Sequence, residues 1–278
     1  MKYKDIILVS LLTLSAPVIA QQNTSVKAAT SKAEFCEKSK DLTYFKSLLY
    51  NSENHISFGN HGGLADGGVC WWHSMLLRSA TYLTVYRPEL PKPSSSEVEQ
   101  ILSWITAARG IVEIPGYKNF SEFTRANYQL VQRYLEQGQI MDGGFGFGWV
   151  RGLSGDYEVA PSKLKEMMDE TYALMKESKR VVYQKLQIQG IVSHAWLLVD
   201  MEQNADGYLL SVVDSNYSGS VVQRQYRNGS KNLSAYSSVP YTSRNSIDFK
   251  GYDYALKMYC KYGKSAADLD RSSGDNLY

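Results

Sequence analysis

The spacing of apolar residues along the chain changes near residue 180. Before that point apolar residues recur three or four positions apart, which predicts helices over residues 33–49, 70–86, 96–109, 119–138 and 161–178. After it, runs rich in Val, Leu and Tyr predict strands over residues 180–187, 191–201, 208–217, 220–226 and 253–260. The segment "NADG" at 204–207 has the composition of a hairpin turn. Helices followed by an antiparallel sheet predict an α+β fold.

Capping residues and glycines set the expected boundaries in the helical half. Ser96 with Glu99, and Asn119 with Glu122, have the spacing of capping boxes that open helices. Gly138 is expected to end the helix over 119–138. Two glycine-rich loops are expected, "SFGNHGGLADGG" over 57–68, directly before the helix that starts at Cys70, and "GGFGFGWVRGLSG" over 143–155.

The first residues have the features of a signal peptide. Lys2 and Lys4 precede an apolar run over 6–14, and "VIA" before Gln21 is typical of a cleavage site after Ala20. A retained N-terminal anchor is the alternative. We expect residues 1–20 to be removed, 21–33 to be a flexible lead-in, and 263–278 to be a loose tail. The segment is bacterial in style, so a secreted or periplasmic protein with no membrane contact after signal removal is predicted.

Composition excludes two broad classes of protein. Apolar residues make up 44% of the 278 positions, which is ample for a packed core, so global disorder is excluded. The net charge is +2 and no basic tract stands out, so nucleic acid is not an expected partner. The composition makes no prediction of oligomeric state.

Export affects how the three cysteines are interpreted. In an oxidising compartment two of Cys36, Cys70 and Cys260 tend to pair, which leaves one possible reactive thiol. A bridge between Cys36 and Cys260 would close a very long loop and contribute about 4–5 kcal/mol. The other two pairings remain open from the cysteine positions alone.

Cys70 has the setting of a nucleophile. A helix N-terminus and a nearby imidazolium both stabilise a thiolate, and Cys70 follows glycines at the predicted start of a helix. His194 lies on a predicted strand, and Asp214 follows it across the 204–207 hairpin, so Asp214 can reach His194 and orient it. His73 shares the helix of Cys70, but the chain offers no second Cys/His pair, so no metal site is predicted.

Three segments resemble the papain-like cysteine peptidase superfamily: "GGVCWWHS", "SHAWLLVD" and "VVDSNYSG". They occur in the family's order of Cys, His and Asn, with Asp214 in place of the usual Asn. The resemblance implies a papain-like domain over residues 34–262, with a helical half packed against a sheet half and the active site in the cleft between them. It implies a hydrolase, most often a peptidase, acting on protein or peptide substrates without a cofactor. Cys70 would attack, His194 would transfer the proton, and Asp214 would orient His194. With Cys70 as the nucleophile, Cys36 and Cys260 are the expected disulfide.

The chain departs from that family at two positions. A glutamine six residues before the cysteine helps to form the family's oxyanion hole, but Leu64 stands there. Asn60 is the expected substitute, together with the backbone N–H of Cys70. The family's tryptophan after the third catalytic residue is replaced by Asn216 and Tyr217. The candidates for the substrate cleft are Trp71, His73, Trp196, Gly143, Gly144 and Phe145, although Trp71 and Trp196 are better explained as packing residues and His73 as a structural residue.

Two further interpretations stay open. "GVC" and "HAW" also resemble transglutaminase-like proteins, which use Cys, His and Asp in this order. Their gap between Cys and His is shorter, so residues 87–180 would then be an insertion. A binding protein on a catalytically decayed scaffold is the third interpretation, favoured by the missing glutamine.

Overall fold

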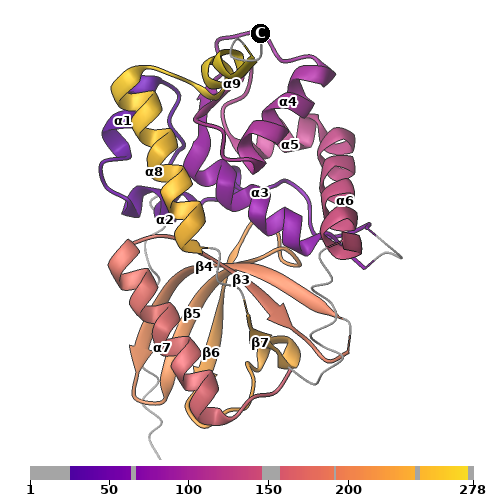
Figure 1. The fold of residues 1–278 in the computed structure, drawn as a ribbon, viewed down its shortest axis with the longest axis vertical. Coiled ribbons are helices and arrows are strands. Elements are labelled where there is room, and N and C mark those ends of the chain that lie inside the picture. The colour runs from indigo at the N-terminus through magenta and orange to yellow at the C-terminus, as the bar shows by residue number, and fades with distance from the viewer. Residues whose placement is uncertain (1–25, 64–66, 146–156, 191, 242–244, 275–278) are drawn as a thin grey trace, which may run out of the picture.

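The structure, a computed structural model, describes residues 26–63, 67–145, 157–190, 192–241 and 245–274. Helices gather in one half and a curled antiparallel sheet forms the other (Figure 1). This arrangement confirms the predicted α+β class. The predicted signal peptide and residues 21–25 lie outside the described residues.

The described helices are, in chain order, α1 (Lys32–Lys38), α2 (Thr43–Leu48), η1 (Ser52–Asn54), α3 (Cys70–Leu83), α4 (Ser95–Thr106), α5 (Phe120–Ala126), α6 (Tyr128–Phe145), α7 (Pro161–Ser178), η4 (Ala235–Ser237), α8 (Asn245–Tyr262) and α9 (Ala266–Gly274). Helix α7 lies along the sheet, whereas the other α-helices form the upper half in Figure 1.

The main sheet has the strand order β6-β5-β4-β3-β7, and every neighbouring pair is antiparallel. Its strands are β3 (Val182–Gln187), β4 (Ser193–Asn204), β5 (Gly207–Asp214), β6 (Val221–Arg227) and β7 (Val239–Pro240). The predicted turn at 204–207 joins β4 to β5, as the pairing of Asn204 with Gly207 confirms. A separate parallel pair, β1 (Thr84–Arg87) with β2 (Val112–Pro115), lies in the helical half.

The strand predicted over residues 253–260 is wrong, because this segment belongs to α8. The apolar residues that α8 buries are spaced three or four apart: Phe249, Tyr252, Ala255 and Tyr259. That spacing places them on one face of a helix. The β propensity of the tyrosines in "DYALKMYC" concealed the helical period.

Gly138 does not end a helix as predicted, because α6 continues to Phe145. A Cβ atom at Gly138 would lie only 2.2 Å from the indole of Trp72 on α3. The glycine therefore allows α6 to approach the first turn of α3 closely. The predicted single helix over 119–138 is in fact two helices, α5 and α6, which meet at Asn127.

Other boundaries differ by smaller amounts. Asn119 caps α5 as predicted, by accepting a hydrogen bond from the backbone N–H of Glu122. The capping box of α4 is formed by Ser94 and Glu97, two residues before the predicted pair. Helix α3 ends at Leu83, because the last residues of the predicted helix form β1 instead.

Helix α3 is the central helix of the molecule, and most of its residues are buried. It meets β4 through Ser74, whose hydroxyl donates a hydrogen bond to the carbonyl oxygen of Ala195 at 3.1 Å. It meets α8 through the buried Arg78, which is bonded to Asn245 and Asp248. Since Ser74 follows Cys70 by one helical turn, the bond to Ala195 holds the start of α3 beside His194.

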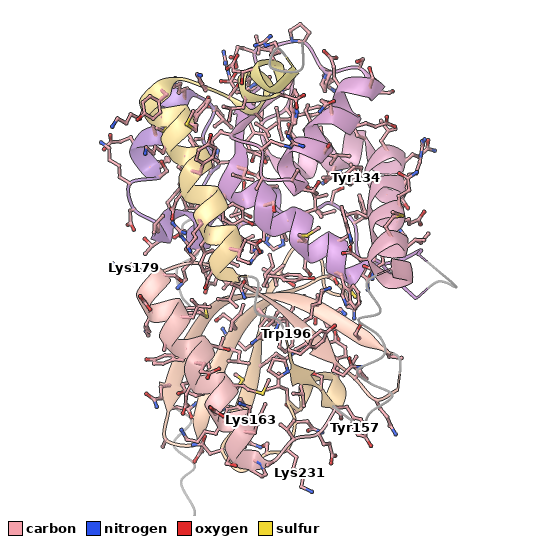
Figure 2. All side chains as sticks on the ribbon, viewed as in Figure 1. Tyr134, Tyr157, Lys163, Lys179, Trp196 and Lys231 are labelled. Carbon is pink, nitrogen blue, oxygen red and sulfur yellow. A yellow bond between two sulfur atoms is a disulfide. The ribbon has the colours of Figure 1, made fainter. Side chains whose placement is uncertain are left out.

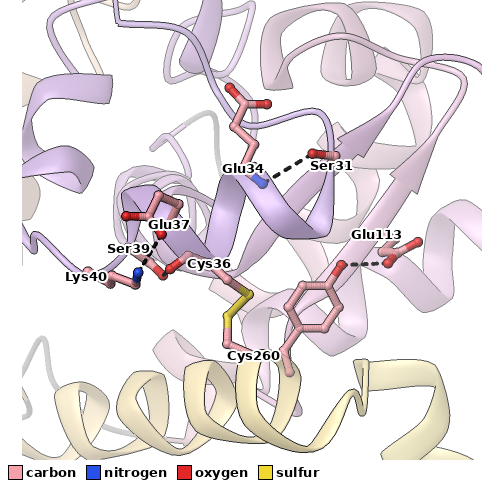
Figure 3. The surroundings of a disulfide bond; sticks show 9 residues. Ser31, Glu34, Cys36, Glu37, Ser39, Lys40, Glu113 and Cys260 are labelled. Atoms are coloured by element: carbon pink, nitrogen blue, oxygen red, sulfur yellow. Dashed lines mark hydrogen bonds and ion pairs between the residues drawn. A yellow bond between two sulfur atoms is a disulfide. The ribbon is translucent and has the colours of Figure 1, made fainter.

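Both ends of the described chain are attached to the helical half. Cys36 on α1 and Cys260 on α8 form the predicted disulfide, with their Cα atoms 5.6 Å apart (Figure 3). At the N-terminal end, Ala29 is buried against the core. At the C-terminal end, the segment that was expected to be a loose tail contains helix α9, which extends to Gly274. Within the described residues, no helix combines the length and the apolar character needed to cross a bilayer.

Candidate functional site

Cys70 is the first residue of α3, and the preceding loop holds it there. Gly68 has φ +85°, and a Cβ atom on it would overlap the amide of Asn60 at 2.6 Å. Asn60 Oδ1 accepts a hydrogen bond from the backbone N–H of Val69 at 2.5 Å. The lack of a side chain at Gly68 therefore leaves room for the Asn60 side chain. Of the three cysteines, Cys70 is left as the free thiol, and it is buried.

His194 and Asp214 lie together in the sheet, as the hairpin predicted. Trp196 on β4 pairs with Asp214 on β5, which places His194 diagonally across from the carboxylate. His194 Nε2 lies 2.8 Å from Asp214 Oδ1, and the carboxylate is fully buried. Because Nε2 is bound to Asp214, the other ring nitrogen is left for Cys70, whose side chain interacts with the imidazole.

The surroundings of His194 favour its charged form. Burial disfavours the imidazolium, but hydrogen bonds and charge from Asp214 and Cys70 outweigh burial and raise the pKa of His194 to about 9. Burial likewise disfavours the carboxylate of Asp214, yet the hydrogen bond and charge of His194 hold the pKa of Asp214 below its ordinary value. His194 is therefore an imidazolium at neutral pH.

The thiol of Cys70 also contacts the strand that carries His194. Cys70 Sγ lies 3.8 Å from the carbonyl oxygen of Ser193, the residue before His194. Cys70 and His194 are each only 4% exposed, so the imidazolium of His194 lies in a poorly hydrated environment, where its interactions with neighbouring charges are strong.

Three of the predicted cleft residues are packing residues. Trp196 is fully buried at the junction of the two halves, and its Nε1 donates to Gln184 Oε1 at 2.8 Å (Figure 2). His73 is buried and lies 2.9 Å from the carbonyl oxygen of Phe58. Trp71 is 4% exposed, with the Lys185 ammonium 3.6 Å from its ring centroid. All three side chains are thus held by contacts within the protein, and their role in a substrate cleft stays a prediction.

Gly143, Gly144 and Phe145 form the last turn of α6 rather than the start of the expected loop. The remainder of that loop, together with Leu64, lies outside the described residues. Whether the end of α6 contacts substrate stays a prediction.

Asn60, the expected oxyanion donor, links the loop before α3 to the end of β5. Its Nδ2 donates to Asn216 Oδ1 at 3.0 Å, and its backbone N–H donates to the carbonyl oxygen of Ser215. One N–H of the Asn60 amide is thus used by Asn216. The proposed role of Asn60 toward an oxyanion stays a prediction.

Sequence reasoning missed Tyr236. Its hydroxyl donates to Asp214 Oδ2 at 2.7 Å, and its ring centroid lies 4.6 Å from that of His194. Tyr236 and Ser237 have φ values of +60° and +45°. This left-handed backbone conformation costs about 1–2 kcal/mol for each residue that is not glycine. No motif marks this tyrosine among the 21 in the chain.

A polar face of α6 also escaped prediction. Five of its side chains bind the loop before α3 or the first turn of α3: Tyr128, Gln132, Glu136, Gln139 and Asp142. Their spacing of four, four, three and three residues places them on one helix face, which is the signal that was present in the sequence. Gln139 is the member nearest to Cys70, because its Oε1 accepts from the backbone N–H of Trp71 at 3.2 Å.

Comparisons of the chain with protein-family models, with curated proteins and with solved structures found no match.

Proposed function

We propose that the protein is an exported cysteine hydrolase with a papain-like arrangement, in which Cys70 forms a thioester with an acyl substrate. One observation carries the proposal: a free thiol at the first residue of α3 interacts with His194, whose other nitrogen is bound to the buried carboxylate of Asp214. This set of a nucleophile, a base and an orienting group is typical of nucleophilic catalysis.

In the acylation step, the Cys70 thiolate attacks the carbonyl carbon of an amide. The imidazolium of His194 then gives its proton to the departing amine, so the C–N bond breaks and a thioester remains. In the second step, neutral His194 takes a proton from water, and the resulting hydroxide attacks the thioester. The thiolate leaves, the acid product is released, and the imidazolium is restored. Asp214 stays ionised throughout and keeps His194 oriented.

The oxyanion that forms on the attacked carbonyl needs hydrogen-bond donors. The backbone N–H of Cys70 is one candidate, because it is the first N–H of α3 and lies at the nucleophile. Gln139 offers a second, since its Oε1 is bound to the first turn of α3 and its Nε2 is the donor on the same amide group. Gln139 would then supply from α6 the amide that the sequence lacks at position 64.

Protein or peptide amides are the substrate class that we propose. Acyl transfer to an amine, as in transglutaminase-like proteins, is the second candidate. It is favoured by one observation, the carboxylate of Asp214 in the third position rather than an amide. Both reactions share the thioester and differ in whether water or an amine accepts the acyl group.

Covalent labelling with a fluorescent peptide that carries a thiol-reactive electrophile tests the proposal. We expect labelling of the wild type and none of Cys70→Ala or of His194→Gln. His194→Gln keeps the thiol, so its labelling by iodoacetamide after unfolding serves as the control for an intact Cys70. Labelling of His194→Gln at the wild-type rate would show an ordinary accessible thiol and would overturn the proposal.

Product analysis separates the two acceptors. The wild type is incubated with a peptide substrate and a labelled primary amine, and the products are identified by mass spectrometry. We expect the free acid; a product that carries the amine would assign the transferase reaction instead.

A further inference from the structure

Tyr236 lies on η4, outside the strands that carry His194 and Asp214, and its side chain contacts both residues. Its hydroxyl lies 2.7 Å from Asp214 Oδ2, the carboxylate oxygen that His194 does not use. Its ring lies against the imidazole of His194 at 4.6 Å between centroids. One side chain thus covers the base and binds the orienting group.

The direction of the hydrogen bonds around Tyr236 follows from one backbone N–H. Because Val69 N–H can only donate, Asn60 Oδ1 accepts, and the Asn60 amide nitrogen is left to donate to Asn216 Oδ1. Asn216 Nδ2 therefore donates to the Tyr236 hydroxyl at 3.0 Å. With its oxygen already accepting, the hydroxyl gives its proton to Asp214.

These bonds close a ring around the site. The ring starts at the backbone N–H of Val69 and ends at the side chain of Cys70. Between them it passes, in order, through the side chains of Asn60, Asn216, Tyr236, Asp214 and His194. The ring joins the start of α3, in the helical half, to the start of β4 and the end of β5. The backbone N–H of Asn216 adds a bond to Asp214 Oδ1 at 3.0 Å.

The backbone at Tyr236 indicates that the side chain is what matters there. A φ of +60° is a conformation that glycine or asparagine adopts readily and tyrosine does not. Strained backbone of this kind persists where the surrounding contacts determine it, and it is common at functional sites. The bonds to Asp214 and Asn216 are the contacts that hold Tyr236 in place.

We propose that Tyr236 is a positioning residue that fixes the Asp214 carboxylate, and through it His194, by donating a hydrogen bond to Oδ2 and covering the imidazole. The proposal rests on the proposed function of the site and deepens it. With Oδ2 held by Tyr236, Oδ1 faces His194 Nε2. Without the hydroxyl, the carboxylate is free to turn, and the imidazolium loses its partner.

Four side chains can affect the titration of His194, and a Tyr236 variant changes only one of them. Cys70 faces it from α3, Asp214 from β5 and Tyr236 from η4, and His73 on α3 is close enough to affect it by charge. Tyr236→Phe keeps the ring over His194 and removes only the hydroxyl. A change in the titration of His194 in this variant therefore reports on the hydroxyl's hold on Asp214.

The test measures the titration of His194 by NMR of its imidazole Cε1–H, together with the rate of labelling by the electrophilic peptide at pH 7. In Tyr236→Phe we expect the pKa of His194 to fall from about 9 by about one unit or more, and labelling to slow by about tenfold. The matched control is Tyr217→Phe, at an exposed tyrosine whose ring lies near Arg224. It should leave both quantities at their wild-type values.

A second variant separates positioning from folding. Tyr236→Gly relieves the left-handed backbone, which offsets part of the stability lost with both side-chain contacts. We expect a melting transition of a folded protein, with a fall in the pKa of His194 and a slowing of labelling at least as large as in Tyr236→Phe. An unchanged or raised pKa of His194 in Tyr236→Phe would overturn the proposal. The titration needs no substrate, so it tests Tyr236 even where no amide is cleaved. An unlabelled wild type would count against the proposed function instead.

Discussion

The two halves of the molecule each bury one histidine close to Cys70, and they tune the two in opposite directions. His73 lies on α3 in the helical half, and its partner is the carbonyl oxygen of Phe58. Burial lowers the pKa of His73 to about 4. His194 lies on β4 in the sheet half, and its pKa is raised to about 9.

Burial is nearly the same for the two histidines, so burial alone does not decide their chemistry. His73 is 2% exposed and His194 is 4% exposed. A neutral carbonyl does not compensate for the desolvation of an imidazolium, whereas the charged partners of His194 do. His73 is therefore neutral at pH 7, whereas His194 is an imidazolium, the form that the proposed mechanism uses as its acid.

The largest effect is expected from exchanging each histidine for glutamine. In His194→Gln, the rate of peptide hydrolysis should fall by about a thousandfold, because the donor of a proton to the departing amine is lost. In His73→Gln, an amide N–H replaces the one that binds Phe58, and the rate should stay within about threefold of wild type. Equal losses in the two variants would remove the functional distinction between the halves.

Asp214→Asn should make the partner of His194 neutral, like that of His73. We expect the pKa of His194 to fall to 6.5 or below, and turnover to drop by about a hundredfold. NMR titration and steady-state rates measure the two effects. Retention of a pKa near 9 in this variant would assign the charge stabilisation to Cys70 rather than to the carboxylate.

The pH dependence of stability should show both histidines, one on each side of a maximum near pH 6.5. The raised pKa of His194 contributes stability that is full below about 6.5 and is lost as the pH rises through about 9. The lowered pKa of His73 contributes stability that is full above about 6.5 and is lost as the pH falls through about 4. Each contribution is about 3 kcal/mol.

Urea unfolding between pH 4 and 9 measures these two limbs. Asp214→Asn should flatten the alkaline limb, and His73→Gln should flatten the acidic limb. If Asp214→Asn still loses stability at alkaline pH as the wild type does, that loss would come from groups other than His194 and Asp214.

The smallest effect on the chemistry is expected from Gly138→Ala, which disturbs the helical half alone. The added methyl group would overlap the indole of Trp72, so overpacking should cost about 1–3 kcal/mol of stability. The pKa of His194 should stay near 9, because its partners lie elsewhere. A shift comparable to that in Asp214→Asn would show that α6 also sets the charge of the site.

Local patterns predicted the parts of the site that lie on regular elements. The glycines before Cys70 predicted a helix start, and the 204–207 hairpin predicted that Asp214 reaches His194, because short antiparallel connections fix register. Tyr236 and Gln139 were not predictable in this way. Each reaches the site through tertiary packing, and one tyrosine or glutamine carries no local mark of its partner.

The fold was likewise predictable where one period dominated. Helix α7 was predicted to its ends, since Pro161 opens it and its periodicity is uninterrupted. At 253–260, β-prone tyrosines at helical spacing misled the prediction, and only the buried face of α8 reveals the period. Gly138 misled it in another way, because the space it leaves is filled by Trp72 from another helix.

Alkylation of Cys70 by iodoacetamide as a function of pH tests whether His194 activates the thiol. At pH 6 we expect the wild type to react at least about tenfold faster than His194→Gln, because the imidazolium stabilises the thiolate. Equal rates of the two proteins at pH 6 would show that His194 does not activate Cys70.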